Sequence, residues 1–373
     1  MKVIFTCGGT AGHVNPALAL AGYLRERDPS AEILFVGAER GLERDLIAHT
    51  EYPFRTVNIS SFHRSLKPRE LRHNLISVRN LLHAKREANA ILNDFRPDLI
   101  VGTGGYASYP IVRYGAEAGI PTAVHESNAV PGLTTRRLAP YARRVMVGFE
   151  DCRAHYHDPD KVVVTGTPVR GDFFTQTKAQ AKRKLGVDDS RPLVVSFWGS
   201  LGAGQMNRMM AEFLALEAAH EPFHHVHGIG SISWEMMHRE LAARGVDLAA
   251  HPSLDVREYI YDMADVMRAA DLVLARAGAS TIAELTALGV PAILVPSPNV
   301  TNHHQEKNAD ILGAHGAALV LAEEGLDGKQ LFTAAAGILH DSAKQAEMAK
   351  NMASLGVRDA TERIYETVMS LVR

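Results

Sequence analysis

The chain has 373 residues, which predicts two or three domains at about 150 residues per domain. It carries 40 Lys and Arg against 42 Asp and Glu, and this near balance argues against a general nucleic-acid binder. The hydrophobic content of 46% excludes wholesale disorder. The two cysteines, Cys7 and Cys152, are too few for a disulfide scaffold or a cysteine-rich zinc site.

No stretch of the sequence reaches the roughly 18 apolar residues of a membrane-spanning helix. The apolar run at residues 3–7 is too short for the core of a signal peptide. We therefore expect a cytoplasmic protein. Attachment to a membrane surface stays open, because it needs no spanning segment.

Short apolar strands alternate with amphipathic helices through the first half of the chain. The predicted helices are Pro16–Arg27 and Leu42–His49. The predicted strands are Val3–Cys7, Ile33–Val36, Asp98–Thr103, Pro121–His125, Val145–Val147 and Val162–Thr165. Apolar strands joined by helical crossovers are typical of a parallel sheet that helices cover on both faces.

The same pattern restarts after a joining region at residues 166–190. Its predicted strands are Pro192–Phe197, Val226–Gly228, Leu272–Ala275 and Ala292–Val295, and a helix at Asp359–Val372 closes the chain. We therefore predict an α/β protein with two Rossmann-like domains, over residues 1–165 and 191–357. Their parallel sheets are expected to face each other across a deep cleft, with ligands at the carboxyl ends of the strands.

Two glycine-rich turns follow strands of the first half, at Gly8–His13 and Gly102–Tyr106. The first turn has neither the pattern of a dinucleotide fingerprint nor that of a P-loop. Backbone N–H groups at a helix start favour an anion, so the pair indicates a phosphate-bearing ligand. Tight strand–helix connections without a ligand are the alternative. His13 is a candidate to take a proton from an attacking hydroxyl, or else a helix cap or core residue.

In the second half, the small-residue segment Ala275–Glu284 joins a strand to a helix. A ligand could lie against this helix start, with Glu284 accepting hydrogen bonds from ribose. Thr281 and Glu284 also fit a capping box, which the residues alone favour. Ser200 could bond a phosphate oxygen or cap a helix. The polar run Asn302–Asn308 suits recognition of sugar hydroxyls.

Five histidines fall in two clusters, namely His224, His225, His227, His303 and His304. No carboxylate or cysteine stands at a recognisable metal-ligand spacing, so we expect surface or loop histidines and no metal site. The Asp-Pro-Asp at residues 158–160 resembles a metal-holding motif of some sugar transferases. Its central proline, however, favours a plain turn.

A basic amphipathic helix is predicted over Arg64–Glu87, with seven basic against two acidic residues. Such a helix can lie on anionic lipid, or pack on the core with a solvated basic face. The residues that would face a membrane are Arg72, Leu75, Arg79, Leu82, Lys85 and Arg86. A second basic cluster in the same half consists of Arg136, Arg137, Arg143 and Arg144.

Eight motifs in order along the chain carry a resemblance to a known family. They are Gly8–Pro16, Gly102–Tyr106, His125–Asn128, Gly166–Arg170, Gly199–Ala203, Arg276–Glu284, His304–Ala309 and Asp359–Arg363. Together they resemble the MurG family of peptidoglycan glycosyltransferases over nearly the whole chain. The resemblance implies a GT-B fold, an N-terminal domain for the acceptor and membrane, and a C-terminal domain for the sugar donor. It also implies that the last helix, within residues 358–373, crosses back to the N-terminal domain.

The activity implied by the resemblance is an inverting transfer of GlcNAc from UDP-GlcNAc to the C4 hydroxyl of MurNAc in lipid I, which gives lipid II. His13 would be the general base, and Arg170 would stabilise the leaving diphosphate. No tightly bound cofactor and no divalent metal would be required. The implied partners are lipid I, the anionic cytoplasmic face of the cell membrane, and proteins of cell-wall synthesis and division, but no nucleic acid.

The same resemblance implies which residues line the site. The contacts to UDP-GlcNAc would be Thr10, Ala11, Gly12, Asn128, Arg170, Ser200, Ile260, Ala279, Ser280, Thr281, Ile282, Ala283, Glu284 and Gln305. Ile260 would pack near uracil, Glu284 would meet the ribose, and Gln305 would meet the GlcNAc hydroxyls. The side of the acceptor and diphosphate would be formed by Gly104, Gly105, Tyr106, His125 and Glu126.

Three other functions stay open. Another GT-B transferase could glucosylate diacylglycerol. A UDP-GlcNAc 2-epimerase shares the fold and needs no lipid acceptor. A non-catalytic subunit would bind UDP-GlcNAc without releasing UDP. Dependence on the acceptor separates these possibilities from the transferase.

Overall fold

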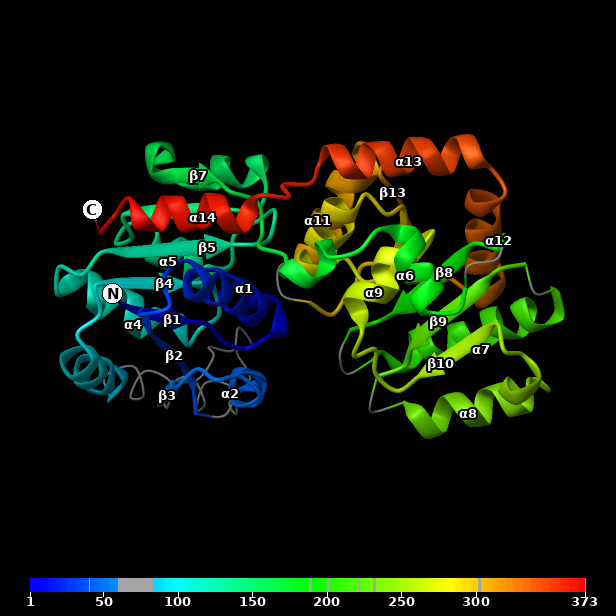
Figure 1. Cartoon of the computed structure of the whole chain (residues 1–373), viewed down its shortest axis with the longest axis horizontal. Helices are drawn as coiled ribbons and strands as arrows, with labels where there is room; N and C mark the ends of the chain where they lie inside the picture. Colours follow the sequence, from blue (N-terminus) through cyan, green and yellow to red (C-terminus); the bar gives the residue numbers. More distant parts are fainter. Residues whose placement is uncertain are drawn as a thin grey trace. The chain divides into compact units, whose positions relative to one another are not determined.

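The computed structural model describes residues 1–39, 41–59, 83–187, 190–199, 202–220, 222–230, 233–300 and 303–372. These residues form two compact units (Figure 1). The first unit combines Met1–Arg170 with Val357–Arg373, and the second is Gly171–Gly356. The change of unit after Arg170 falls inside the joining region expected at residues 166–190.

The first unit contains a seven-stranded parallel sheet in the order β3-β2-β1-β4-β5-β6-β7. Its strands are β1 (Lys2–Thr6), β2 (Glu32–Ala38), β3 (Phe54–Val57), β4 (Leu99–Gly102), β5 (Thr122–Glu126), β6 (Arg144–Val147) and β7 (Val162–Val164). Its helices are α1 (Ala11–Arg27), α2 (Leu42–Ala48), α4 (Ser108–Glu117), α5 (Leu133–Leu138) and α14 (Ala360–Met369), with a further helical run over 83–95. The six predicted strands are all present, and β3 is additional.

Both faces of this sheet are buried because side chains alternate along each strand. Phe5 of β1 packs in a cluster with Leu20 of α1 and Ile364 of α14. Ile4, one residue earlier, lies on the other face in a cluster with Ile111 of α4. The two clusters explain why the sequence shows continuous apolar strands instead of alternating ones.

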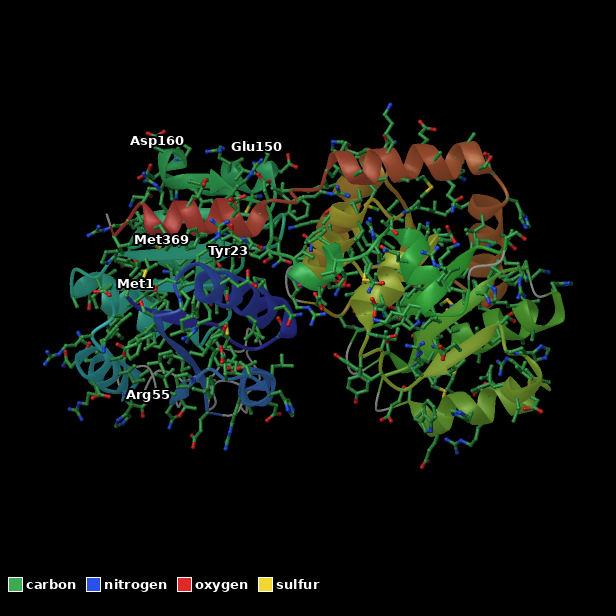
Figure 2. The ribbon with its side chains drawn as sticks, in the orientation of Figure 1. Met1, Tyr23, Arg55, Glu150, Asp160 and Met369 are labelled. Carbon is green, nitrogen blue, oxygen red and sulfur yellow. The ribbon has the colours of Figure 1, made fainter. Side chains whose placement is uncertain are left out.

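The closing helix α14 packs against α1 (Figures 1 and 2). The rings of Tyr23 on α1 and Tyr365 on α14 meet edge to face with centroids 5.4 Å apart. Arg27 and Glu362 add an exposed ion pair of 3.5 Å between the two helices. The last segment of the chain is therefore part of the first unit.

The second unit contains a six-stranded parallel sheet in the order β10-β9-β8-β11-β12-β13. Its strands are β8 (Leu193–Phe197), β9 (His224–Gly228), β10 (Leu254–Arg257), β11 (Leu272–Ala275), β12 (Ala292–Leu294) and β13 (Ala318–Val320). Its helices are α6 (Lys178–Lys184), α7 (Gly204–His220), α8 (Trp234–Ala243), α9 (Met263–Ala269), α10 (Ala279–Leu288), α11 (His304–Ala314), α12 (Gly328–Leu339) and α13 (Ser342–Ser354). Two Rossmann-like parallel sheets confirm the predicted fold class.

The first helix begins earlier than predicted. We expected it to start at Pro16, where a proline suits the first turn, but α1 begins at Ala11 with Thr10 as its N-cap. The amides of His13 and Val14 close the first turn by donating to the Thr10 carbonyl, at 3.0 and 3.3 Å. His13 therefore lies in the first turn of the helix and not at the end of a loop.

The expectation of surface or loop histidines is wrong for the first cluster. His224, His225 and His227 lie on the buried strand β9, and His227 has no exposed surface. The rings of His225 and His227 are tolerated there because they are hydrogen-bonded, with Ser196 Oγ 2.7 Å from both His225 Nε2 and His227 Nδ1. His225 Nδ1 is also 2.6 Å from a carboxylate oxygen of the buried Glu217.

Candidate functional site

The two glycine-rich turns of the first unit interlock. They follow β1 and β4, which are parallel neighbours, so both turns emerge at the same edge of the sheet. Gly104 and Gly105 have φ values of +107° and +82°, which favour glycine. A Cβ on Gly105 would lie 2.0 Å from the Gly8 carbonyl oxygen. Thr103 Oγ1 donates to the His13 carbonyl at 2.6 Å, so the two turns are fixed to each other.

His13 is held in the tautomer that a general base needs. Its Nδ1 lies 2.7 Å from the Gly8 carbonyl oxygen and 3.3 Å from Thr10 Oγ1. A carbonyl can only accept, so Nδ1 carries the proton and Nε2 keeps its lone pair. The ring packs over Gly104, where an added Cβ would come within 3.0 Å of Nε2. The half-buried imidazole can therefore accept a proton at Nε2 without first changing tautomer.

A buried carboxylate that the sequence analysis missed supports the first turn. Glu43, near the start of α2, has no exposed surface. Its Oε2 accepts from the Gly9 amide at 3.0 Å, and its Oε1 accepts from the Ala38 amide at 2.8 Å. Gly37 and Gly41, which precede Glu43 in the chain, leave room for its side chain, since a Cβ on either would collide with it.

The segment after β5 is ordered by its own polar side chains. Glu126 is 3% exposed and accepts from the amide and side chain of Asn128, at 3.1 and 2.9 Å, and from the Gly132 amide at 2.9 Å. His125 Nε2 donates to the Gly166 carbonyl at 2.9 Å. Burial lowers the pKa of His125, so its ring stays neutral. Both residues shape the turn that presents Asn128.

Tyr106 and Arg170 complete the predicted residues of the first unit. The Tyr106 ring lies over Gly9, where an added Cβ would come within 3.6 Å. Burial and, to a smaller extent, the nearby Glu43 charge raise the pKa of the Tyr106 hydroxyl.

Arg170 is exposed and is the last residue of the first of the two chain segments that form this unit. Asp158 and Asp160 are exposed at a short 3₁₀ turn, where Figure 2 labels Asp160.

The described donor residues predicted in the second unit follow three strands of one parallel sheet. Ile260 follows β10, the start of α10 follows β11, and Gln305 follows β12. These loops therefore emerge at the carboxyl edge of that sheet, where α/β proteins bind ligands. Ser200 lies outside the described residues.

The capping-box interpretation of Thr281 and Glu284 is wrong. Helix α10 begins at Ala279 with Gly278 as its N-cap, so Thr281 is already inside the helix and cannot cap it. The residues Ala279, Ser280, Thr281, Ala283 and Glu284 are half-buried. Ile282 is 1% exposed, so its side chain belongs to the core. The helix start therefore presents small residues and backbone N–H groups, which suits an anionic ligand.

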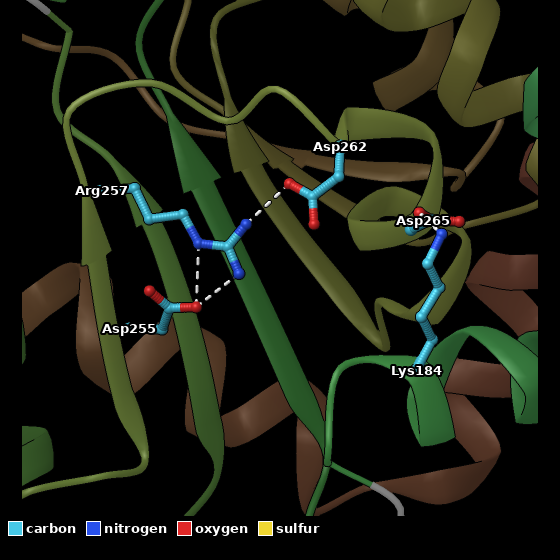
Figure 3. Close-up of polar contacts among 5 residues, drawn as sticks. All are labelled: Lys184, Asp255, Arg257, Asp262 and Asp265. Atoms are coloured by element: carbon cyan, nitrogen blue, oxygen red, sulfur yellow. Dashed lines mark hydrogen bonds and ion pairs between the residues drawn. The ribbon is translucent and has the colours of Figure 1, made fainter.

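A charged clamp holds the loop that carries Ile260 (Figure 3). Arg257 donates from Nε and Nη2 to Asp255 Oδ2, at 2.9 and 2.5 Å, and from Nη1 to Asp262 Oδ1 at 2.7 Å. The hydrogen bonds to Asp255 raise the pKa of Arg257, which stays charged. Ile260, 4% exposed, packs against Gly228, where a Cβ would come within 3.0 Å of its Cδ1.

Gln305 lies in the first turn of α11 and ties it to the end of β12. Its Oε1 accepts from the Ser297 amide at 2.8 Å. A cavity of about 520 Å³ opens beside this segment, lined among others by Pro296, Asn299 and Glu306. The helix N-cap, His303, adopts a left-handed conformation with φ of +51°.

The predicted membrane-facing residues are only partly described. Arg72, Leu75, Arg79 and Leu82 lie outside the described residues. Lys85 and Arg86 are exposed on the helical run over 83–95. Lys85 Nζ lies 3.9 Å from Glu117 and 5.1 Å from the centroid of the Tyr114 ring. No helix in the described part of the chain combines the length and apolar character needed to span a bilayer.

Within the described ranges, no group of three or more His, Cys, Asp or Glu residues is arranged to hold a metal ion. The described site offers a half-buried imidazole beside glycine-rich turns, with backbone N–H groups at helix starts. Such groups suit a reaction in which a hydroxyl attacks and a phosphate-bearing group leaves.

Two parallel α/β units with these turns have the architecture of the GT-B class. Residues 3–147 match the glycosyltransferase family 28 N-terminal domain, and residues 193–364 match its C-terminal domain. The chain belongs to glycosyltransferase family 28.

Individual relatives agree with this family. A protein of Acetivibrio thermocellus is 40% identical over all of this chain and 99% of its own length. It is named UDP-N-acetylglucosamine--N-acetylmuramyl-(pentapeptide) pyrophosphoryl-undecaprenol N-acetylglucosamine transferase. The crystal structure of Acinetobacter baumannii MurG matches with a TM-score of 0.74 and 25% identity, covering 99% of each chain. A UDP-GlcNAc 2-epimerase from Neisseria meningitidis matches with a TM-score of 0.67 and 15% identity, covering 99% of this chain and all of that one, which shows the shared fold alone.

Proposed function

We propose that this protein transfers GlcNAc from UDP-GlcNAc to the C4 hydroxyl of MurNAc in lipid I and so makes lipid II. The observation that carries the proposal is the hydrogen bond of 2.7 Å from His13 Nδ1 to the Gly8 carbonyl, which leaves Nε2 ready to accept a proton. The transferase name of a relative that is 40% identical over the whole chain supports the substrates.

The reaction then needs one proton transfer and one displacement. His13 Nε2 takes the proton of the acceptor hydroxyl while its oxygen bonds to the anomeric carbon of GlcNAc. The bond from that carbon to the UDP oxygen breaks, and UDP leaves with both electrons. Attack from the opposite face inverts the α-linked donor to a β-linked product. Backbone N–H groups at helix starts, together with Arg170, stabilise the departing charge, so no divalent metal is required.

The donor contacts are assigned to residues at the carboxyl edges of the two sheets. In the first unit they are Thr10, Ala11, Gly12, Asn128 and Arg170; in the second they are Ser200, Ile260, Gln305 and the helix start Ala279–Glu284. Ile260 contributes to the uracil side, since the Arg257 clamp fixes its loop. Glu284 binds the ribose, and Gln305 binds the GlcNAc hydroxyls.

The acceptor side is assigned to the first unit, with Gly104, Gly105 and Tyr106 nearest the base and His125 and Glu126 behind them. The second unit is the donor domain. The interlocking of Gly105 with the Gly8 peptide supports this assignment, because it places the second turn against the base-bearing turn.

We infer that the first unit also contacts the cytoplasmic face of the cell membrane. The exposed Arg136 and Arg137 of α5 and the 52% exposed Leu133 beside them provide charge and apolar surface for anionic lipid. Co-sedimentation tests this. Binding to phosphatidylglycerol vesicles, but not to phosphatidylcholine vesicles, at physiological salt supports it, and equal partition to both vesicle types contradicts it.

The decisive experiment measures UDP release from UDP-GlcNAc with a short-chain lipid I analogue, with diacylglycerol, and with no acceptor. Release that requires the lipid I analogue and fails with UDP-glucose supports the proposal. Tight donor binding without release contradicts it and favours a binding subunit. Conversion of the donor without any acceptor favours the epimerase.

A further inference from the structure

Glu43 and His13 contact opposite edges of a single peptide unit. The Gly9 amide donates to Glu43 Oε2 at 3.0 Å, and the Gly8 carbonyl accepts from His13 Nδ1 at 2.7 Å. The Gly8 carbonyl and the Gly9 amide belong to one peptide group, and in a trans peptide they point in opposite directions. The order of contacts is therefore carboxylate, peptide, imidazole.

We propose that Glu43 is a positioning residue that acts on His13 through the Gly8–Gly9 peptide. A carboxylate that accepts from a peptide N–H increases the negative charge on the carbonyl oxygen of the same peptide, because hydrogen bonds in a chain polarise one another. That oxygen then holds the Nδ1 proton more strongly and stabilises the imidazolium that forms when Nε2 takes a proton. The peptide takes the place that a carboxylate has beside the histidine of a catalytic triad.

The surroundings leave this peptide one orientation. A Cβ on Gly105 would lie 2.0 Å from the Gly8 oxygen and 2.9 Å from the Gly8 nitrogen, so the second glycine turn packs directly on it. The other oxygen of Glu43 is anchored at 2.8 Å to the Ala38 amide at the end of β2. Glu43 thus connects the ends of β1 and β2 and is fixed at both oxygens.

The neighbouring titratable groups keep their neutral forms near neutral pH. Burial raises the pKa values of Cys7 and Tyr106, and burial lowers that of His125. No ion pair of the described residues includes Glu43.

The test substitutes Glu43 with Gln, which keeps the size but offers one acceptor oxygen to two amides. This inference rests on the proposed transfer reaction. We expect kcat for UDP release with the lipid I analogue to fall about tenfold and the KM for UDP-GlcNAc to stay within about twofold. The acid limb of the kcat profile moves to lower pH, because the imidazolium loses its stabilising partner. Glu43→Asp, which keeps the charge, recovers part of the rate.

The matched control is Asp98→Asn. Asp98 also accepts from a backbone amide, that of Lys2 at 2.7 Å, but at the start of β1 and so at the opposite end of the strand. It should leave kcat and the pH profile unchanged. A Glu43→Gln enzyme with the wild-type rate and profile overturns the proposal. So does a loss of kcat that Asp98→Asn reproduces.

A second readout does not depend on activity. Long-range ¹H–¹⁵N correlation of the histidine rings, with His13 assigned through His13→Gln, reports which ring nitrogen carries the proton. We expect the Nδ1–H form in the wild type and a mixture of both forms in Glu43→Gln. If the enzyme transfers no sugar but the tautomers behave in this way, only the proposed function fails. A wild-type Nε2–H form overturns the relay itself.

Discussion

The buried histidines of the second unit predict a specific sensitivity to acid. Burial lowers the pKa of His225 and that of His227 to about 3 from an ordinary 6.5. Below pH 6.5 both rings take up a proton in the unfolded chain but not in the folded chain. The two histidines therefore lower the free energy of unfolding as the pH falls. Burial raises the pKa of Glu217 well above 4.5, so the folded chain keeps a carboxyl proton that the unfolded chain releases, which opposes one histidine.

Between pH 6.5 and 4.5 each buried histidine accounts for one extra proton on the unfolded chain. One proton corresponds to about 1.4 kcal/mol per pH unit, so each histidine removes about 3 kcal/mol of stability over that interval. In His227→Gln the contribution of one histidine is absent. The variant is less stable at pH 7, but its stability should change by about 3 kcal/mol less than that of the wild type across the interval.

Urea unfolding at several pH values, followed by tryptophan fluorescence, measures this difference. Both tryptophans, Trp198 and Trp234, lie in the second unit, so the signal reports the unit that holds the cluster. His315→Gln, on an exposed histidine of the same unit, is the control and should follow the wild type. Parallel curves of stability against pH for His227→Gln and the wild type would refute the reasoning.

Four further predictions concern the site. Gly105→Ala should lower the free energy of unfolding in urea by at least about 3 kcal/mol, and Gly119→Ala by only about 1 kcal/mol. Both glycines have positive φ, but only at Gly105 would the added Cβ meet a carbonyl oxygen. Equal losses would contradict the interlocking of the two turns. Arg257→Met should raise the KM for UDP-GlcNAc about fivefold. Lys184→Met removes an ion pair of 2.5 Å with Asp265 on α9 (Figure 3), leaves the Arg257 contacts in place, and should not raise this KM. His13→Ala should lower kcat by about 10²- to 10⁴-fold with little change in the donor KM, and full turnover would remove the base assignment. Addition of EDTA should leave the rate of UDP release unchanged, and a loss that Mg²⁺ restores would contradict a metal-independent reaction.

Apart from the edge strand β7, the strands that the sequence predicted have neighbours on both sides. β1 and β4 lie inside the first sheet with almost every side chain buried, which gives the apolar runs that reveal them. The three missed strands, β3, β10 and β13, are all edge strands. β3 reads Phe-Arg-Thr-Val with two exposed residues in the middle, so it shows no apolar run. Edge strands are partly solvated, so they lack a continuous apolar run. Strand pairing by itself does not change the amino-acid composition and cannot be read from it.

The local structure of the candidate site was predictable where neighbouring residues in the sequence set it. The turn before His13 is marked by its glycines, and its place after a strand follows from the apolar run before it. Glu43 could not be found in this way, because its contacts to Gly9 and Ala38 arise only when β1, β2 and α2 have assembled. The prediction for the histidines of β9 was wrong for a similar reason. Their hydrogen-bond partners Ser196 and Glu217 come from β8 and α7, which lie elsewhere in the sequence.

Both units fix the turn after a central strand with a buried polar side chain from outside that turn. In the first unit Glu43 accepts from Gly9. In the second, the fully buried Asn207 of α7 donates to the Ile229 carbonyl at 2.8 Å, where a Cβ on Gly202 would come within 2.1 Å. Stabilising charge in a transition state requires that the donors are oriented before the charge develops. A glycine-rich turn alone has too much conformational freedom to keep its N–H groups oriented. A turn that binds phosphate therefore needs the glycines, which allow close approach, and also a buried polar group, which restricts the conformation of the turn.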